Sequence, residues 1–175
     1  TVSEDLWDKS DTLEYKSQPM DILMKQNPTL IVNVSASPLN FLKDSNRKSI
    51  LINKAKETKL PLFYVNNIGA QTELIFDGGS MVVTPQGNIF TQMPFFQEDI
   101  KIFSVDDVCN KKTDLFEANI LSIEKIYQAL LLGIKDYFAK LNFKKALIGS
   151  SGGVDSALVA VLATHALGKE NVETI

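Results

Sequence analysis

The sequence predicts an α/β protein in which the strands of a sheet are covered by helices. Apolar, β-branched runs of strand length alternate with segments whose apolar residues recur at helical spacing. Proline, glycine and asparagine stand between these segments, as is typical of turns. With 175 residues, of which 45% are hydrophobic and 22% are charged, the chain can build a globular core.

The N-terminal part of the chain is predicted to alternate between helices and buried strands. Pro19 stands at the first turn of one helix and Pro28 ends it, while Ser45 can cap a second helix. The strand predictions depend on uninterrupted apolar runs such as Leu62-Phe-Tyr-Val-Asn66. The expected elements are helices over 19–27 and 45–59, strands over 29–34 and 62–66, a hairpin of strands 80–84 and 88–92, and a strand over 101–105.

The C-terminal part is predicted to contain a long helix and then a strand–loop–helix unit. A polar stretch, DDVCNKKTD, begins at Asp106 and is the best candidate for a linker, so we expect a domain boundary within 106–116. Gly168 is expected to end the last helix. The expected elements are an amphipathic helix over 118–141, a strand over 144–148 and a helix over 154–167.

Composition argues against several classes of function. A net charge of −3 is not that of a general nucleic-acid or membrane-surface protein. The single cysteine, Cys109, leaves no partner for a disulfide and fits a reducing, cytoplasmic compartment. The single histidine, His165, argues against a histidine-based metal site or catalytic triad. No apolar run reaches the roughly 18–20 residues that a membrane span needs.

One stretch, GSSGGVDS over residues 149–156, has the composition of a phosphate-binding turn. It follows a predicted strand and opens a predicted helix, so backbone N–H groups and the helix dipole would face an anion there. The stretch matches neither G-x-x-x-x-G-K-[ST] nor G-x-G-x-x-G, and it lacks the lysine of the first pattern. The candidate phosphate-binding residues are Gly149, Ser150, Ser151, Gly152, Gly153, Val154, Asp155 and Ser156.

Asp155 raises a question of charge within this loop. A carboxylate repels phosphate unless a cation lies between them, and Mg²⁺ commonly binds one or two carboxylates together with substrate phosphates. Asp155 is therefore the candidate magnesium ligand. The alternative is an ordinary strand–helix turn in which Asp155 or Ser156 caps the helix.

The string S-G-G-V-D-S resembles the S-G-G-x-D-S signature of the ATP-pyrophosphatase superfamily. The resemblance implies that the loop holds the pyrophosphate of ATP while a substrate oxygen is adenylylated. At the other end of the chain, TVSEDLW resembles the C-E-D-x-W elbow of the nitrilase superfamily, with Ser3 at the position of the cysteine nucleophile. The strings NVSASP at 33–38, YVNNIGAQ at 64–71 and ELIFDGGS at 73–80 resemble segments of nitrilase-type glutaminases.

This order of motifs is characteristic of glutamine-dependent NAD synthetases, which the chain resembles as an internal piece over nearly its whole length. The resemblance implies that 1–105 are the C-terminal portion of an α-β-β-α nitrilase-like glutaminase sandwich. After the linker, 117–175 would begin an ATP-pyrophosphatase domain of the adenine-nucleotide α-hydrolase type, with a doubly wound parallel sheet. The implied enzyme is a homo-oligomer without nucleic-acid or membrane partners.

The implied reaction uses glutamine, ATP, Mg²⁺ and nicotinic acid adenine dinucleotide. Glutamine hydrolysis would supply ammonia, ATP would adenylylate the dinucleotide's carboxylate, and ammonia would displace AMP to give NAD. By the resemblance, Ser35 and Lys43 would contact glutamine. Ser35 can equally cap the turn after its strand, and Lys43 can be a solvated charge. Ser3 predicts loss of glutaminase activity, because a serine hydroxyl does not ionise as easily as a cysteine thiol, and the nitrilase site has no histidine base to take its proton.

Two alternatives remain open at the level of sequence. The first is another ATP-pyrophosphatase amidotransferase, such as a GMP or asparagine synthetase, although those carry glutaminases of a different type. The second is an inactive nitrilase-like scaffold fused to an ammonia-dependent ligase. Restoring the thiol by Ser3→Cys would separate the second alternative from the main hypothesis, because a scaffold would gain no glutaminase activity.

Overall fold

The chain folds into two compact units in the computed structural model, which describes residues 1–6, 19–40, 44–110 and 122–175. The first unit comprises Thr1–Ile68 and Phe76–Asn119, and the second comprises Gly69–Ile75 and Ile120–Ile175. Each unit combines helices with strands, so the predicted α/β class is confirmed. Within the described ranges, no helix has both the length and the apolar character needed to cross a membrane.

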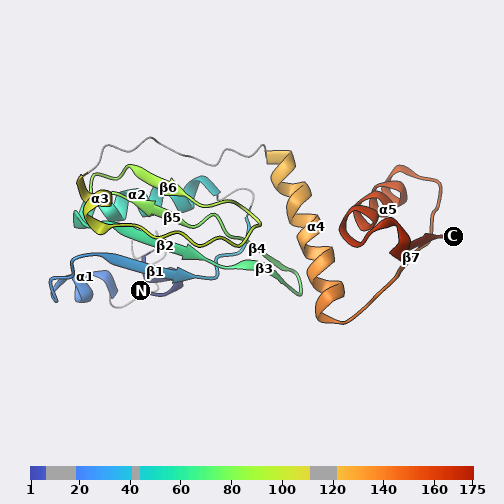
Figure 1. Cartoon of the computed structure of the whole chain (residues 1–175), viewed down its shortest axis with the longest axis horizontal. Coiled ribbons are helices and arrows are strands. Elements are labelled where there is room, and N and C mark those ends of the chain that lie inside the picture. The colour runs from blue at the N-terminus through green and yellow to red at the C-terminus, as the bar shows by residue number, and fades with distance from the viewer. Residues whose placement is uncertain (7–18, 41–43, 111–121) are drawn as a thin grey trace. The chain divides into compact units, whose positions relative to one another are not determined.

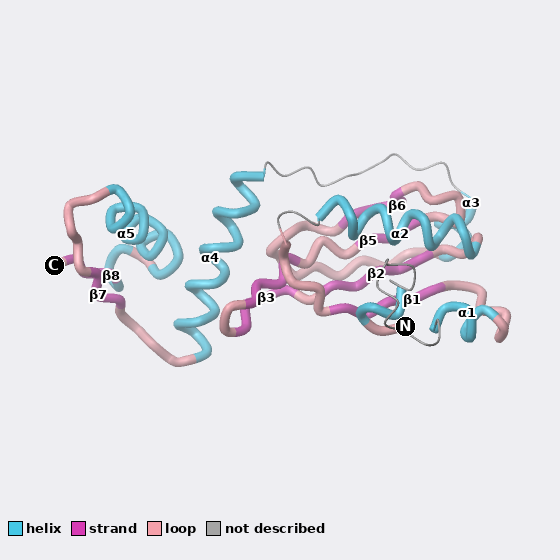
Figure 2. The backbone as a smooth tube through the Cα atoms, turned by 180° about the vertical axis from the view of Figure 1, so that it is seen from behind, coloured by secondary structure: helices cyan, strands magenta, loops and turns pink. Residues whose placement is uncertain are grey.

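A four-stranded sheet in the order β1-β2-β5-β6 lies at the centre of the first unit (Figure 1). Strands β1 (Ile31–Ser35) and β2 (Leu62–Asn66) are parallel, whereas β5 (Met81–Val83) and β6 (Ile89–Gln92) form the predicted antiparallel hairpin. A parallel pair needs a crossover connection, which α2 (Asp44–Thr58) supplies. Figure 2 shows α2 lying across one face of the sheet.

The core of the first unit lies between the sheet and its helices. Side chains alternate along β1, so that Ile31, Asn33 and Ser35 are buried while Val32 and Val34 are 43% and 53% exposed. The sequence predicted helices on one side of the sheet, and this burial pattern agrees with that prediction. Helices η1 (Ser3–Leu6) and α1 (Pro19–Met24) also contribute to this core, which consists of Leu6, Met20, Ile31, Leu51, Ala55, Leu62, Tyr64, Met81, Val83 and Ile89.

The predicted strand over 101–105 is wrong. Residues 101–104 have no regular structure, and Val105 begins a short helix, α3 (Val105–Asn110). The Ser104 hydroxyl accepts a hydrogen bond from the Asp107 amide at 3.4 Å, which is the bond of a helix N-cap. The first residues of the expected linker are therefore helical, with Val108 fully buried, and the others lie outside the described residues.

The sequence did not predict the hairpin of β3 (Ile68–Gln71) and β4 (Leu74–Asp77). Its two-residue turn contains Thr72 at a φ of 54°. Hairpin turns that need a positive φ are usually recognised by glycine, asparagine or aspartate, and a β-branched residue gives no such signal.

The second unit is built on two helices and a parallel strand pair. Helix α5 (Val154–Leu167) is the crossover between β7 (Ala146–Ile148) and β8 (Val172–Thr174), with the short η2 (Lys169–Asn171) before β8. Helix α4 (Ser122–Lys140) corresponds to the predicted long helix, whose expected first residues lie outside the described ones. The strand–loop–helix unit expected around residue 150 is confirmed.

Helices α4 and α5 pack against each other within this unit. The Tyr127 hydroxyl and His165 Nδ1 lie 2.6 Å apart, and the two rings meet edge to face. The single histidine therefore has a packing role between two helices.

Candidate functional sites

The first candidate site is a sharp turn at the start of the chain. The Thr1 amino group donates to the Val32 carbonyl at 3.0 Å, and the Thr1 carbonyl accepts from the Val34 amide at 3.2 Å, so this residue runs beside β1. The chain then turns at Ser3, whose φ is 46°, and enters η1, which buries Leu6 in the core. A non-glycine residue with positive φ between an extended segment and a helix is typical of turns that expose a nucleophile.

Hydrogen bonds hold the turn in this conformation. Asn33 is fully buried, and its amide nitrogen donates to the Thr1 hydroxyl at 3.0 Å and to the Ser3 carbonyl at 3.3 Å. The Asp5 carboxylate accepts from the Val2 amide at 2.8 Å. The sequence did not single out Asn33 as a site residue. The available signal was a polar residue on the inward side of an apolar strand, where a buried amide needs partners.

The surroundings of Ser3 bear on its reactivity. The chain's only histidine packs on Tyr127 in the second unit. Among the described residues, no base forms a hydrogen bond with the Ser3 hydroxyl. A serine acts as a nucleophile only when an adjacent base takes its proton, so the described residues show the shape of a nucleophile elbow without a hydrogen-bonded base.

A buried polar network lies at the ends of β1, β2 and β4. The Arg47 guanidinium and the Asp77 carboxylate form an ion pair at 2.9 Å, with 7% and 0% of their side chains exposed. The Asn66 side chain donates to Asp77 at 3.4 Å and to the Gly78 carbonyl at 2.9 Å, and it accepts from the Ser37 amide at 2.9 Å. The network joins the strings NVSASP and FDGGS, and it makes Asp77 a structural residue.

Ser35 lies beside this network, at the end of β1 and on the same buried face as Asn33. Burial raises the pKa of the nearby Tyr64 hydroxyl, and the Arg47 charge together with the hydroxyls of Ser35 and Ser37 partly opposes this. No hydrogen bond joins Ser35 to Ser3 in the described part of the chain. Lys43, the other expected glutamine contact, lies outside the described residues.

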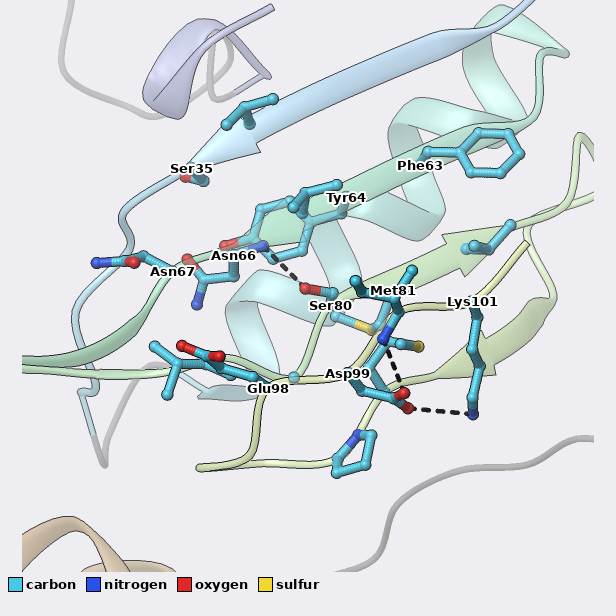
Figure 3. A pocket seen from close by; sticks show the side chains of 18 of the residues that line it. Ser35, Phe63, Tyr64, Asn66, Asn67, Ser80, Met81, Glu98, Asp99 and Lys101 are labelled. Carbon is cyan, nitrogen blue, oxygen red and sulfur yellow. Dashed lines mark hydrogen bonds and ion pairs between the residues drawn. The ribbon is translucent and has the colours of Figure 1, made fainter. Parts of the chain in front are cut away.

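A broad pocket of about 560 Å³ opens over the other face of this sheet (Figure 3). The exposed side chains of Val34 and Val65 contribute to its floor, and Ser3 does not line it. The Asp99 carboxylate and the Lys101 ammonium lie 3.8 Å apart at its rim. Apolar side chains of the sheet face form much of this pocket, and its lining contains no histidine or cysteine. Its polar lining residues are Ser35, Tyr64, Asn66, Asn67, Ser80, Gln97, Glu98, Asp99 and Lys101.

The second candidate site is the glycine loop between β7 and α5. Gly152 has a φ of 78°, and a Cβ built on Gly149 or on Gly152 meets no atom within 4 Å. The space over the loop is therefore open to a ligand that approaches the backbone. Gly153 is the N-cap of α5 and supplies no side-chain capping bond, which leaves the first-turn amides for an anion.

The loop's hydroxyl groups are brought together by the fold. The Ser151 and Ser156 hydroxyl oxygens lie 3.2 Å apart, and the Ser156 hydroxyl donates to the Gly153 carbonyl at 3.0 Å. Ser150 is held by its amide, which donates to the Ile175 carbonyl at 2.6 Å. These contacts fix the positions of the two hydroxyls and of the Ser150 amide within one turn.

Asp155 is exposed in the first turn of α5, where a carboxylate can share a cation with a bound phosphate. Within the described residues, no group of three or more histidine, cysteine, aspartate or glutamate side chains is arranged to hold a metal ion. A magnesium ion at Asp155 would therefore need ligand oxygens from the phosphates themselves. This donor set fits Mg²⁺, which commonly binds in that way.

The sequence similarity of this chain to known proteins extends over the segments that contain both candidate sites. The sequence model of the NAD synthase family matches residues 126–175. The chain is 43% identical to a glutamine-dependent NAD(+) synthetase of Synechocystis sp. over 98% of its length, and 33% identical to one of Thermotoga maritima over its full length. It spans about a third of the length of these relatives, 32% and 35% respectively.

A solved structure agrees with the sequence comparison. The glutamine-dependent NAD+ synthetase of Acinetobacter baumannii, in complex with adenosine diphosphate, matches 99% of this chain with a TM-score of 0.83 and 33% identity. The chain covers 32% of that protein. The predicted resemblance to glutamine-dependent NAD synthetases, with this chain as a piece of the longer protein, is confirmed.

Proposed function

We propose that the chain is part of a cytoplasmic, homo-oligomeric, glutamine-dependent NAD synthetase, with the elbow in its glutaminase domain and the glycine loop in its ATP-binding domain. The observation that carries the proposal is the presence of both sites in one chain. Similarity to a protein of that name extends over the full length of the chain, so it includes both Ser3 and Gly149–Ser156. The division of the chain at 106–116 is part of the same proposal.

In the glutaminase domain, Ser3 would occupy the position of the cysteine that attacks the amide carbon of glutamine. A cysteine thiol ionises with a pKa of about 8.5, so a useful fraction is thiolate near neutral pH. A serine hydroxyl needs a base, and no base forms a hydrogen bond with the Ser3 hydroxyl among the described residues. We therefore propose that the chain with Ser3 hydrolyses little glutamine and uses ammonia from solution. We also propose that Ser35 and Lys43 contact the glutamine substrate.

In the ATP-binding domain, the loop amides and the hydroxyls of Ser150, Ser151 and Ser156 would hold the pyrophosphate part of ATP. The carboxylate oxygen of nicotinic acid adenine dinucleotide attacks the α-phosphorus, the bond from that phosphorus to the bridging oxygen breaks, and pyrophosphate leaves. Ammonia then attacks the activated carbonyl carbon and loses a proton, and AMP leaves with the electron pair of the acyl bond. The product is the amide, NAD.

The residues of the loop fit this division of roles. The loop has no lysine that could contact a γ-phosphate during its transfer, so we propose that it binds the pyrophosphate that leaves. Asp155 would hold Mg²⁺, which would offset the repulsion between its carboxylate and the phosphates. Gly149 and Gly152 would let the backbone approach the phosphates, because the space where their side chains would stand is open.

The test compares two nitrogen sources in the intact protein, with ATP, Mg²⁺ and the dinucleotide present. We expect ammonium to support NAD formation and glutamine to support it at least about 100-fold more slowly, since the nucleophile is not activated. Ser3→Cys should raise the glutamine-driven rate and leave the ammonium-driven rate unchanged. NAD from neither source would contradict the proposal as a whole.

A second candidate, favoured by Ser3 itself, is a nitrilase-like domain that serves only as a scaffold for an ammonia-dependent ligase. The same experiment separates the two. A Ser3→Cys variant that still makes NAD from ammonium but gains no glutamine-driven activity would favour the scaffold. Efficient use of glutamine by the chain with Ser3 would exclude both this candidate and the proposed loss of activity.

A further inference from the structure

The hairpin of β3 and β4 divides between the two units. Its tip, Gly69–Ile75, belongs to the second unit, whereas the neighbouring residues Ile68 and Phe76 belong to the first. The tip therefore packs with residues far along the chain. We call the segment Gly69–Ile75 the arm.

Two side chains of α4 bind both backbone groups of one arm residue. The Asp136 carboxylate accepts from the Ala70 amide at 2.8 Å, and the Lys140 ammonium donates to the Ala70 carbonyl. Asp136 and Lys140 are one helical turn apart and form an ion pair at 4.0 Å. Ala70 is 5% exposed, so its amide and carbonyl have little access to water. Without the clamp, both groups would be buried with no equivalent hydrogen-bond partner.

Two glycines allow the close approach that the clamp requires. A Cβ on Gly69 would lie 3.1 Å from the Asp136 carboxylate oxygen, and the φ of 131° at Gly69 is itself unfavourable for other residues. A Cβ on Gly133 would lie 3.2 Å from the Ile75 side chain. Both contacts lie between the arm and α4. Gly69 and Ile75 stand on opposite sides of the hairpin turn, so both strands of the arm pack against α4.

The base of the same hairpin is held within the first unit. The Gly78 amide donates to the Asn67 carbonyl at 3.0 Å, and Asp77 forms the buried ion pair with Arg47. The strands thus run from the polar network beside Ser35 to a tip that is bound by α4. Helix α4 in turn packs on α5, whose N-terminus is the glycine loop.

We infer that Asp136 and Lys140 are positioning residues that couple the glutaminase sheet to the ATP-binding unit through the arm. The inference depends on the proposed function and extends it with a role for residues that touch neither glutamine nor ATP. Because the arm follows β2 of the glutaminase sheet in the chain, the clamp on Ala70 links α4 to the segment that leaves that sheet. Releasing the clamp lowers glutamine-driven synthesis more than synthesis from added ammonium, which needs no transfer between domains.

The experiment uses the intact protein carrying Ser3→Cys, in which glutamine-driven turnover can be measured. Asp136→Ala is compared with Asp136→Asn, which keeps an acceptor for the Ala70 amide. Lys135→Met is the matched control, since Lys135 is exposed on the same helix. We expect Asp136→Ala to lower the ratio of glutamine-driven to ammonium-driven NAD formation at least about tenfold, Asp136→Asn to retain most of it and Lys135→Met to leave it unchanged.

Hydrogen exchange of the arm gives a readout that does not depend on activity. Asp136→Ala should make the Ala70 amide exchange at least about tenfold faster, because its acceptor is lost, while amides of β1 and β2 keep their rates. Unchanged exchange at Ala70 would overturn the clamp. Faster exchange with an unchanged nitrogen-source ratio would overturn the coupling role while the proposed function stands. A parent protein that makes NAD from neither source would refute the proposed function and the coupling role with it, and exchange would still decide whether the clamp holds the arm.

Discussion

Removing one partner of the buried ion pair between Arg47 and Asp77 should destabilise the first unit strongly. Asp77→Ala leaves the Arg47 guanidinium without its carboxylate at a position where only 7% of that side chain is exposed. Breaking a buried pair in this way costs about 3–5 kcal/mol, because the remaining charge is neither solvated nor paired. The Asn66 amide also loses one of its acceptors.

The assay is hydrogen exchange of the intact protein in increasing urea, followed in β1, β2 and β5 so that only the first unit is reported. With an m-value of about 2 kcal/mol per molar urea, the expected loss lowers the midpoint by roughly 1.5–2.5 M. The control replaces both partners by apolar side chains, Arg47→Met with Asp77→Leu, and should recover at least about half of the loss. A loss below about 1 kcal/mol for Asp77→Ala, or no recovery in the double variant, would refute the reasoning.

Two further predictions concern Tyr64 and the glycine loop. Burial raises the pKa of Tyr64 above 10.0, so its stabilising contribution is complete below that pH and is lost as the pH rises through the raised pKa. Tyr64→Phe should remove this alkaline loss in urea unfolding at about pH 9 and about pH 11, and an identical pH dependence in both proteins would contradict the assignment. Gly152→Ala should cost about 1–2 kcal/mol of unfolding free energy, because its φ is 78°. Gly149→Ala should leave unfolding unchanged and raise the KM for ATP, and an unchanged KM would argue against phosphate at the loop.

The regular elements were predictable where local pattern and tertiary environment agree. Leu62–Asn66 and Val154–Leu167 begin and end as predicted, because an uninterrupted apolar run and a glycine-bounded helix leave few alternatives. The prediction failed at 101–105, where an apolar run was given more weight than the Ser104-x-x-Asp107 spacing, which is a helix-start signal. The β3–β4 hairpin was missed because Thr72 at its turn carries no such signal.

The candidate sites were predictable to different degrees. The glycine loop is a contiguous string, so its residue types and spacing were sufficient to locate it between a strand and a helix. The elbow could be located by resemblance, but its anchor Asn33 and the pairing of Arg47 with Asp77 depend on contacts across about 30 residues of chain. The clamp of Asp136 on Ala70 spans 66 residues and follows from tertiary packing alone.

The most direct test of the proposed function is the fate of ATP during synthesis from ammonium and nicotinic acid adenine dinucleotide. If the glycine loop retains pyrophosphate while the dinucleotide's carboxylate takes the adenylyl group, each NAD formed should be accompanied by one AMP and one pyrophosphate. The products can be counted by chromatography of the quenched reaction. Formation of ADP and inorganic phosphate in step with NAD would contradict the role given to residues 149–156.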